Sequence, residues 1–225
     1  MPLESVAYVP IYLFTYVGLL LTPLSLKKNK WLFLVWFFLV NVFMFTGLWK
    51  IHIAGMRLPL LAFSQLPAVG MLLYLLHYVH HKKIEINPRA WVRWSIFRLI
   101  GVYYLLILFS NELPLDFVAK AAFFEIIIGL WAVGLSFGKK NLFDSVWFVA
   151  WNTLGLVSSL VINFQIRYWA YFGEELPQRF DLILHFNRFP EMWLSLYWVP
   201  LSICIHLVLF YCYLEHRIKG RVSKT

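Results

Sequence analysis

The sequence predicts an all-α fold, a polytopic transmembrane bundle of about seven helices with its N-terminus outside and its C-terminus in the cytoplasm. Of its 225 residues, 61% are hydrophobic and only 14% are charged, whereas a soluble domain carries about 25% charged residues. The apolar residues form long runs, and a spanning helix needs roughly 20 residues of this kind. Seven such spans would use most of the chain, so we expect residues 1–225 to form a single transmembrane domain.

The first three spans end in polar or basic connections. Residues 1–5 lack the positive region of a signal peptide, so we expect the first apolar segment to remain as a permanent helix. The second segment carries Asn41 near its middle, and the third ends in two histidines followed by two lysines. The predicted spans are 6–26, 31–49 and 59–79.

The last four spans follow a basic linker that contains Pro88. An acidic turn separates the fourth from the fifth, and a short basic turn separates the fifth from the sixth. The predicted spans are 90–109, 117–137, 142–164 and 191–213. In the outer connection 165–190, a proline start and mixed polarity predict an interfacial helix over 177–189. That helix either seals the bundle or caps an outward-facing cavity.

Basic residues set the orientation. The formal net charge is +9, and the cations cluster in short runs between apolar segments. Thirteen lie on the side predicted to be cytoplasmic, namely Lys27, Lys28, Lys30, Lys82, Lys83, Arg89, Arg93, Lys139, Lys140, Arg217, Lys219, Arg221 and Lys224. Five lie on the other side, namely Lys50, Arg57, Arg167, Arg179 and Arg188. This asymmetry follows the positive-inside rule. We expect anionic lipid headgroups at the cytoplasmic face to be the partners of these cations, and no nucleic acid.

Two charges fall inside predicted spans, where an unpaired charge is costly. Arg98 lies near the middle of the fourth span and Glu125 near the middle of the fifth. Their depths differ by about 5 Å along the helices, which an extended arginine covers, so we expect an ion pair. Ala121, Gly129 and other small residues share a face with Glu125 and should allow close helix packing. The pair is either a structural lock between two helices or a substrate anchor in a cavity.

Polar residues also recur at helical spacing in the last two spans. The sixth carries Ser145, Asn152, Gly155, Ser159 and Asn163, and the seventh carries Glu191, Ser195, Ser202 and His206. With Asn41 and Gln65 they either line a polar interior or form ordinary hydrogen bonds between helices.

Histidines and cysteines give no firm cofactor site. His77, His80 and His81 share one face, and His206 is predicted at a depth similar to that of His77, as haem ligation would require. The histidines beside lysines at the headgroup level need no metal, and no cysteine or carboxylate lies near them, so we expect no metal and no cofactor. Cys204 and Cys212 lie eight residues apart on one helix, too far apart to bridge.

Enzyme signatures are missing. The seventh span has no lysine for a retinal Schiff base, and the chain has no Gly-x-Ser-x-Gly, His-Glu-x-x-His or phosphate-loop motif. The sequence does not decide whether the chain is an enzyme, and the missing motifs favour a protein without enzymatic activity.

Several motifs carry a resemblance. They are Arg98-x-x-Gly101, Leu113-Pro114-x-x-Phe117, Glu125-x-x-x-Gly129-x-x-Ala132, Trp151-Asn152-x-x-Gly155-Leu156, Val199-Pro200-Leu201 and His206-Leu207. This half of the chain resembles an uncharacterised family of bacterial multi-spanning integral membrane proteins. The resemblance implies a location in the bacterial inner membrane and supplies no activity. Two departures are the glutamate at 125, where the family pattern has aspartate, and Val157-Ser158-Ser159, where it has a further acidic residue.

The function expected from these residues is that of a small-molecule or ion carrier. Arg98, Glu125, Asn152 and His206 form its candidate buried site, and its substrate is unknown. A non-catalytic assembly or sensor subunit is the first alternative. A membrane-embedded enzyme or a binder of haem or metal is the second, and it would use His77, His206 and Glu125.

Overall fold

Every regular element that the computed structural model describes is a helix, in agreement with the predicted fold class. The described residues are 12, 13, 15, 16, 18, 19, 30–46, 58–81, 87–108, 115–138, 141–172 and 193–222. The longer helices are α2 (Lys30–Phe45), α3 (Leu58–His80), α6 (Leu115–Phe137), α7 (Val146–Phe172) and α9 (Val199–Val222). The shorter elements are α4 (Pro88–Trp94), η3 (Ser95–Ile100), α5 (Gly101–Leu108), η4 (Leu142–Asp144) and η6 (Leu194–Trp198).

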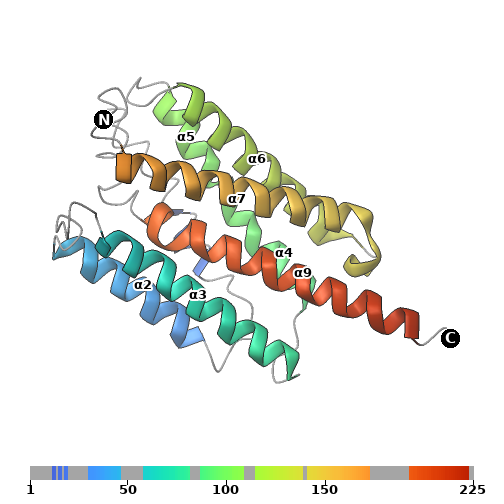
Figure 1. The fold of residues 1–225 in the computed structure, drawn as a ribbon. Helices are drawn as coiled ribbons and strands as arrows, with labels where there is room; N and C mark the ends of the chain where they lie inside the picture. Colours follow the sequence, from blue (N-terminus) through green and yellow to red (C-terminus); the bar gives the residue numbers. More distant parts are fainter. Residues whose placement is uncertain are drawn as a thin grey trace.

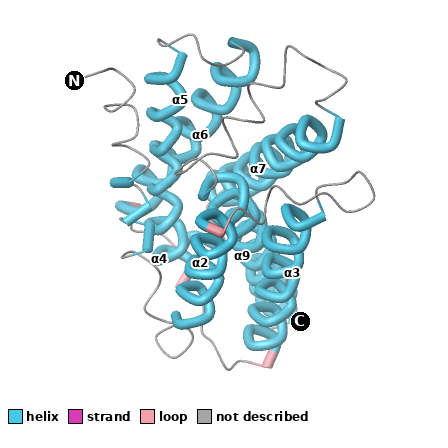
Figure 2. The backbone as a smooth tube through the Cα atoms, turned by 90° about the vertical axis from the view of Figure 1, so that its left-hand side faces the viewer, coloured by secondary structure: helices cyan, strands magenta, loops and turns pink. Residues whose placement is uncertain are grey.

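Helix α9 occupies the centre of the described bundle (Figure 1). It packs between α3 and α7, with α2 on the outer side of α3 and α6 on the outer side of α7. The segment α4–η3–α5 runs along α6, and Figure 2 shows α4, α5 and α6 grouped on one side of the bundle. In an 18-residue part of the apolar stretch Leu196–Ile218, 67% of the residues are buried, against 39% in parts of the same length from Lys120–Phe137 and Val146–Gln165. Of these three stretches, the one in α9 is therefore the most enclosed.

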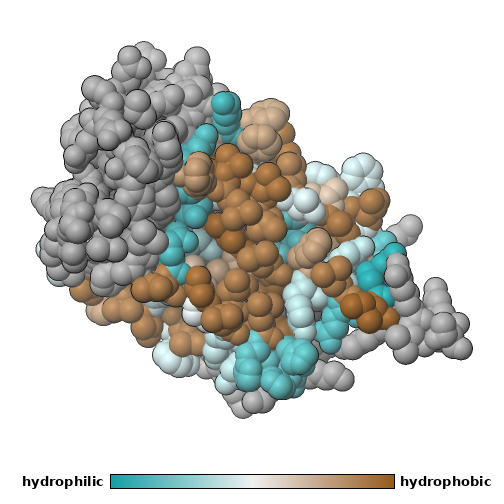
Figure 3. Space-filling model, viewed as in Figure 1, coloured by the Kyte–Doolittle hydropathy of each residue, from teal (hydrophilic) through white to brown (hydrophobic). Residues whose placement is uncertain are grey.

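Three of the described helices are long and apolar enough to cross a membrane. These stretches are Lys120–Phe137, Val146–Gln165 and Leu196–Ile218, and they overlap the predicted fifth, sixth and seventh spans. Large apolar side chains also point outward from α2, α3, α6 and α7. Figure 3 shows apolar side chains over the middle of the described surface on one face, with polar ones toward its edges. Such a surface fits a lipid environment better than water.

The predicted helix over 90–109 is one helical segment in three parts. Asn87 caps α4, since its side chain accepts hydrogen bonds from the backbone N–H groups of Arg89 (3.0 Å) and Ala90 (3.3 Å), and Pro88 takes the first helical position. The chain then tightens into the 3₁₀ helix η3, which carries Arg98. The hydroxyl of Ser95 donates to the carbonyl oxygen of Trp91 (3.2 Å), a contact that often bends a helix.

The start of the predicted span 191–213 is a π-helical turn, η6, directly before α9. Pro200 lacks a backbone N–H, so the carbonyl oxygen of Leu196 has no donor at the usual α-helical position. The preceding turn widens, as π turns do within α-helices. Widening of this kind re-aims the side chains of the turn, and two of them, Leu194 and Trp198, line the pocket described below.

Helix ends and predicted membrane boundaries differ. Helix α2 ends at Phe45, before the predicted limit at 49, whereas α7 and α9 continue to Phe172 and Val222, beyond 164 and 213. Hydropathy marks where lipid ends, but a helix continues while its backbone bonds are satisfied. Most of the span 6–26, the Leu113-Pro114 turn, residues 177–189 and most of the connecting cations lie outside the described residues.

Candidate functional site

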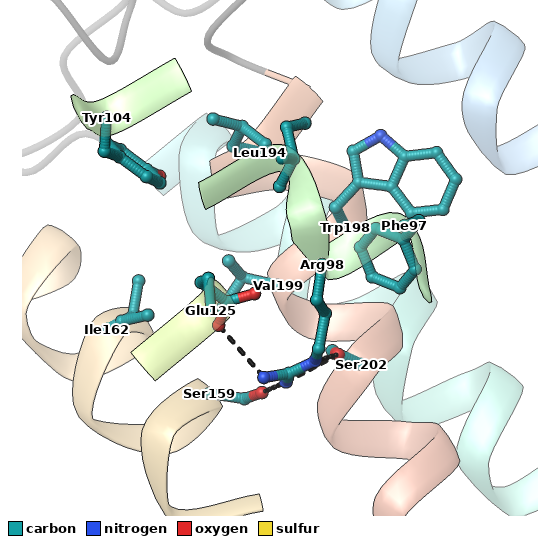
Figure 4. A pocket seen from close by; sticks show the side chains of 11 residues that line it. Phe97, Arg98, Tyr104, Glu125, Ser159, Ile162, Leu194, Trp198, Val199 and Ser202 are labelled. Atoms are coloured by element: carbon teal, nitrogen blue, oxygen red, sulfur yellow. Dashed lines mark hydrogen bonds and ion pairs between the residues drawn. The ribbon is translucent and has the colours of Figure 1, made fainter. Parts of the chain in front are cut away.

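Arg98 and Glu125 form the predicted ion pair. Arg98 is 1% exposed on η3, and its Nη1 donates to the Oε1 of Glu125 on α6 at 3.0 Å (Figure 4). The prediction that the two side chains face each other across neighbouring helical segments is confirmed. Burying a charge costs much free energy unless the charge is paired and hydrogen-bonded, and both conditions hold here.

A set of hydroxyls surrounds the rest of the guanidinium. Its Nε and Nη2 donate to the Oγ of Ser202 (3.2 and 2.8 Å), and its Nη1 donates to the Oγ of Ser158 (3.1 Å). Its Nη2 also bonds the Oγ of Ser159 and the carbonyl oxygen of Gly155, the latter at 3.1 Å. A guanidinium has five N–H donors, and these contacts engage all of them. Arg98 therefore joins α6, α7 and α9.

The two serines on α7 are oriented by their own backbone. The hydroxyls of Ser158 and Ser159 donate to the carbonyl oxygen of Gly155 at 3.1 and 2.8 Å. Because a hydroxyl has one hydrogen and two lone pairs, this leaves the oxygen lone pairs for Arg98. The resemblance implies an acidic residue in this stretch. In this chain, neutral hydroxyls occupy it and take two of the arginine's hydrogen bonds.

Small residues permit the close approach of η3 and α5 to α6. A Cβ atom on Gly101 would lie 2.9 Å from the carbonyl oxygen of Ala122, and one on Gly129 would lie 3.0 Å from the backbone nitrogen of Leu99. Ala121 and Ala132 of α6 are also buried. The predicted small-residue face is confirmed, and it brings the two helices near enough for the ion pair to form.

Asn152 and His206 form a second polar pair, between α7 and α9. The side-chain Nδ2 of Asn152 donates to the carbonyl oxygen of His206 at 3.0 Å, and its Oδ1 lies 2.8 Å from the Nδ1 of the ring. Since that amide oxygen can only accept, Nδ1 carries the proton. The buried Nε2 has no hydrogen-bond partner in the described part of the chain, and it faces Gly155.

A pocket opens beside the ion pair (Figure 4). Its polar wall is Arg98, Glu125, Ser159 and Ser202, and its apolar wall is Phe97, Ile100, Tyr104, Ile162, Leu194, Trp198 and Val199. It is small, with a cavity volume of about 20 Å³, and part of it is open to the outside. The Glu125 side chain is 11% exposed. Asn152 and His206 do not line this pocket. Of the four candidate residues, Arg98 and Glu125 therefore line the pocket, and Asn152 and His206 form a contact between helices.

Aromatic side chains hold the apolar wall in place. The rings of Phe97 and Trp198 lie 4.6 Å apart between centroids, and Trp94 lies 4.4 Å from Phe97. The indole Nε1 of Trp198 donates to the Oγ1 of Thr15 at 3.1 Å, and that of Trp94 donates to the carbonyl oxygen of Gly18 at 3.0 Å. Part of the first predicted span therefore packs behind this wall.

The other polar residues make contacts between helices. The side chain of Gln65 donates to that of Asn163 at 3.1 Å, and the Nε1 of Trp193 donates to Asn41 at 3.1 Å. Ser159 and Ser202 are the members of the two stripes that line the pocket. For the amides, the interpretation as interhelical hydrogen bonds therefore describes the structure better than the interpretation as a polar lining.

The histidines of α3 lie apart from this site. The His77 ring packs on His81 at 4.5 Å between centroids, and His80 Nδ1 lies 2.8 Å from the hydroxyl oxygen of Tyr211. His206 instead packs on Trp151 at 5.1 Å. Among the described residues, no group of three histidine, cysteine or acidic side chains lies close enough together to hold a metal ion.

Ser158 and the aromatic wall were not predicted from the sequence. Ser158 was not included in the polar stripe of α7, although it follows Gly155 by three residues and Asn152 by six. That spacing is a usable signal, because a serine can donate to the carbonyl oxygen three or four residues earlier and still accept elsewhere. Phe97 and Trp198 carry no such signal in a chain that is 20% aromatic.

Comparison with known proteins gives one match. The model of a family described as a domain of unknown function (DUF8737) matches residues 56–214, which include every described residue of the pocket and of both polar pairs. No curated protein matches the chain, and no solved structure does.

Proposed function

The chain belongs to the DUF8737 family, and we propose that it is an integral membrane protein that carries a small molecule or an ion through the Arg98–Glu125 site. The observation that supports this is the position of the pocket, at the meeting of a 3₁₀ stretch and a π turn. Substrate sites of membrane carriers are typically built where helices are interrupted near the membrane centre. A charged pair lining such a pocket fits a site that accepts and releases a solute.

The proposed topology has seven spans, with the N-terminus outside and the C-terminus in the cytoplasm of a bacterial inner membrane. It is supported by the three long apolar helices and by the asymmetry of lysine and arginine between the two sides. Single cysteines at Lys28 and Glu112 test it, since Cys204 and Cys212 are buried and contribute little background. The cysteine at 112 should react with an impermeant maleimide on intact cells, and the one at 28 only after permeabilisation.

The carrier proposal is tested by flux into proteoliposomes. Wild type and Glu125→Gln would be compared at equal protein content, with radiolabelled sodium, a pH-sensitive dye for protons and radiolabelled methylammonium as solutes. We expect wild type to move one of them faster than empty liposomes, and Glu125→Gln to lose tenfold or more of that rate. Flux that is unchanged by the substitution would exclude a transport role for Glu125.

A second candidate function, a non-catalytic assembly or sensor subunit, is favoured by one observation. All five donors of Arg98 are engaged within the protein, as in a structural lock. Under this alternative, the protein would move none of the three solutes and would co-purify at fixed stoichiometry with another membrane protein. The flux assay and the composition of the purified complex separate the two candidates.

A further inference from the structure

A second arginine of the fourth predicted span lies at the surface of the protein. That span is predicted to start at residue 90, so Arg93 of α4 lies three residues inside it, about 5 Å along the helix. Its side chain is exposed, and no hydrogen bond or ion pair engages it among the described residues. A charge inside a span is costly, and an arginine near the end of a span reaches toward the headgroups. The counter-charge of Arg93 therefore has to come from outside the described protein.

Every third residue after Arg93 faces outward. From 91 to 105, the exposed or half-buried residues are Arg93, Ile96, Leu99, Val102 and Leu105, and all the others are buried. Three residues make one turn of a 3₁₀ helix, so residues i and i+3 eclipse, whereas in an α-helix such a row would rotate by about 60° at each step. The 3₁₀ winding of η3 therefore keeps the first four of these side chains nearly in line. We call these four residues (Arg93, Ile96, Leu99 and Val102) the outward row.

The outward row is a narrow strip with protein on both sides. On one side lies α6, since a Cβ atom on Gly129 of that helix would lie 2.9 Å from the Cδ2 of Leu99. On the other side lies the first apolar segment, because the buried Trp94 donates to the carbonyl oxygen of Gly18 at 3.0 Å. The strip is apolar from Ile96 onward and carries a charge at one end only.

The length and the charge of the outward row match one phospholipid. From Arg93 to Val102 the segment rises about 16 Å, close to one leaflet, which is half of a hydrocarbon core about 30 Å thick. A guanidinium binds phosphate oxygens through two parallel N–H groups. Arg89 adds a positive charge one turn earlier, and Asp144 of the neighbouring element η4 is engaged by His216 at 3.2 Å. These charges favour a headgroup with a net negative charge.

From these observations we infer that the outward row binds one anionic phospholipid, with its phosphate on Arg93 and one acyl chain along Ile96, Leu99 and Val102. The site lies on the opposite side of the segment from the Arg98–Glu125 pair, which faces the interior of the bundle. The inference rests on the proposed membrane topology and is independent of carrier activity.

Photo-crosslinking tests the inference. A benzophenone amino acid would be placed at Val102, at the deep end of the row, or at Leu130, an exposed residue of α6 that serves as the control. The full-length protein would be irradiated in nanodiscs of phosphatidylcholine with a minor share of phosphatidylglycerol, and the attached lipid identified by mass spectrometry. At Val102, phosphatidylglycerol should be enriched about fivefold over its bulk share, the effect of one cation beside an anionic headgroup. Adducts at Leu130 should follow the bulk composition.

Two charge variants assign the enrichment to Arg93. Arg93→Gln should return the share of phosphatidylglycerol at Val102 to the bulk value. Arg217→Gln removes another exposed arginine from the side predicted to be cytoplasmic, and it should leave the enrichment unchanged. Because both side chains are exposed, neither substitution disturbs the packed interior.

Three results would overturn the inference: bulk composition at both positions, enrichment that survives Arg93→Gln, or adducts at Val102 with a second copy of the protein in place of lipid. Failure of the proposed function looks different. Enrichment at Val102 without any solute flux would remove the carrier and keep the lipid site. Lipid adducts at neither position would remove the membrane topology and the lipid site together.

Discussion

Gly155 contacts both polar pairs of the protein. Its carbonyl oxygen accepts from Arg98, Ser158 and Ser159. A Cβ atom built on it would lie 2.4 Å from the Cε1 of His206 and 2.5 Å from its Nε2. A side chain at this position is therefore incompatible with the observed place of the histidine ring. One residue without a side chain connects the ion pair to the Asn152–His206 pair.

We predict that Gly155→Ala lowers stability by about 1–3 kcal/mol, because the added methyl group overpacks a filled interior. The displaced ring would also lose its bond to Asn152. Gly134→Ala is the matched control on α6, since nothing lies within 4 Å of its Cβ position. It should be neutral or stabilising by about 0.5–1 kcal/mol, as alanine favours helix.

Thermal unfolding of both variants in detergent measures the difference. In Gly155→Ala/His206→Ala, the two effects should be less than additive, because removal of the ring makes room for the methyl group. Equal melting temperatures for Gly155→Ala and Gly134→Ala would contradict the packing argument.

At the scale of elements, the ion pair links η3 to α6, and the serines extend the link to α7 and α9. The pair itself was predictable, because two mid-span charges in consecutive segments can avoid the cost of burial by meeting. The serine contacts were not, since a serine in a helix can donate to a carbonyl oxygen of its own helix, as Ser158 and Ser159 do, with or without an outside donor. Pro200 likewise signals a disturbed turn but leaves open whether the helix kinks or widens.

We predict that Arg98→Met destabilises the protein by about 3–5 kcal/mol, because it leaves the Glu125 carboxylate buried without its partner. Arg98→Met/Glu125→Leu should be more stable than Arg98→Met alone, since apolar replacements of a buried pair remove the unpaired charge. Chemical unfolding in mixed micelles, analysed as a double-mutant cycle, gives the coupling energy. A double variant that is less stable than Arg98→Met would show that Glu125 has stabilising contacts of its own.

At the scale of the whole molecule, the apolar exterior is the feature that sequence predicts best. The 61% hydrophobic composition exceeds what a bundle of this size can bury, so apolar side chains must also point outward. Leu130, in the middle of the stretch Lys120–Phe137, is 57% exposed, and Phe137 at its end is 80% exposed. The surfaces at which helices contact one another are harder to predict from the sequence. Hydropathy is similar for residues that face lipid and those that face another helix.

Leu130→Lys should reduce membrane insertion by about 2.5–3.5 kcal/mol, the cost of a lysine at the centre of a span. Phe137→Lys should insert almost normally, because a lysine at a helix end reaches the headgroups. Carbonate extraction of cell membranes measures both. Equal insertion of the two variants would mean that this face of α6 does not lie against lipid.

The position of α9 has a consequence for biosynthesis. The most enclosed of the three long apolar stretches, Leu196–Ile218, is made by the ribosome after the other two. Until α9 packs against the earlier helices, Arg98 lacks Ser202, and Asn152 lacks His206. During synthesis, the hydrogen bonds of both polar pairs therefore stay incomplete until α9 has been made.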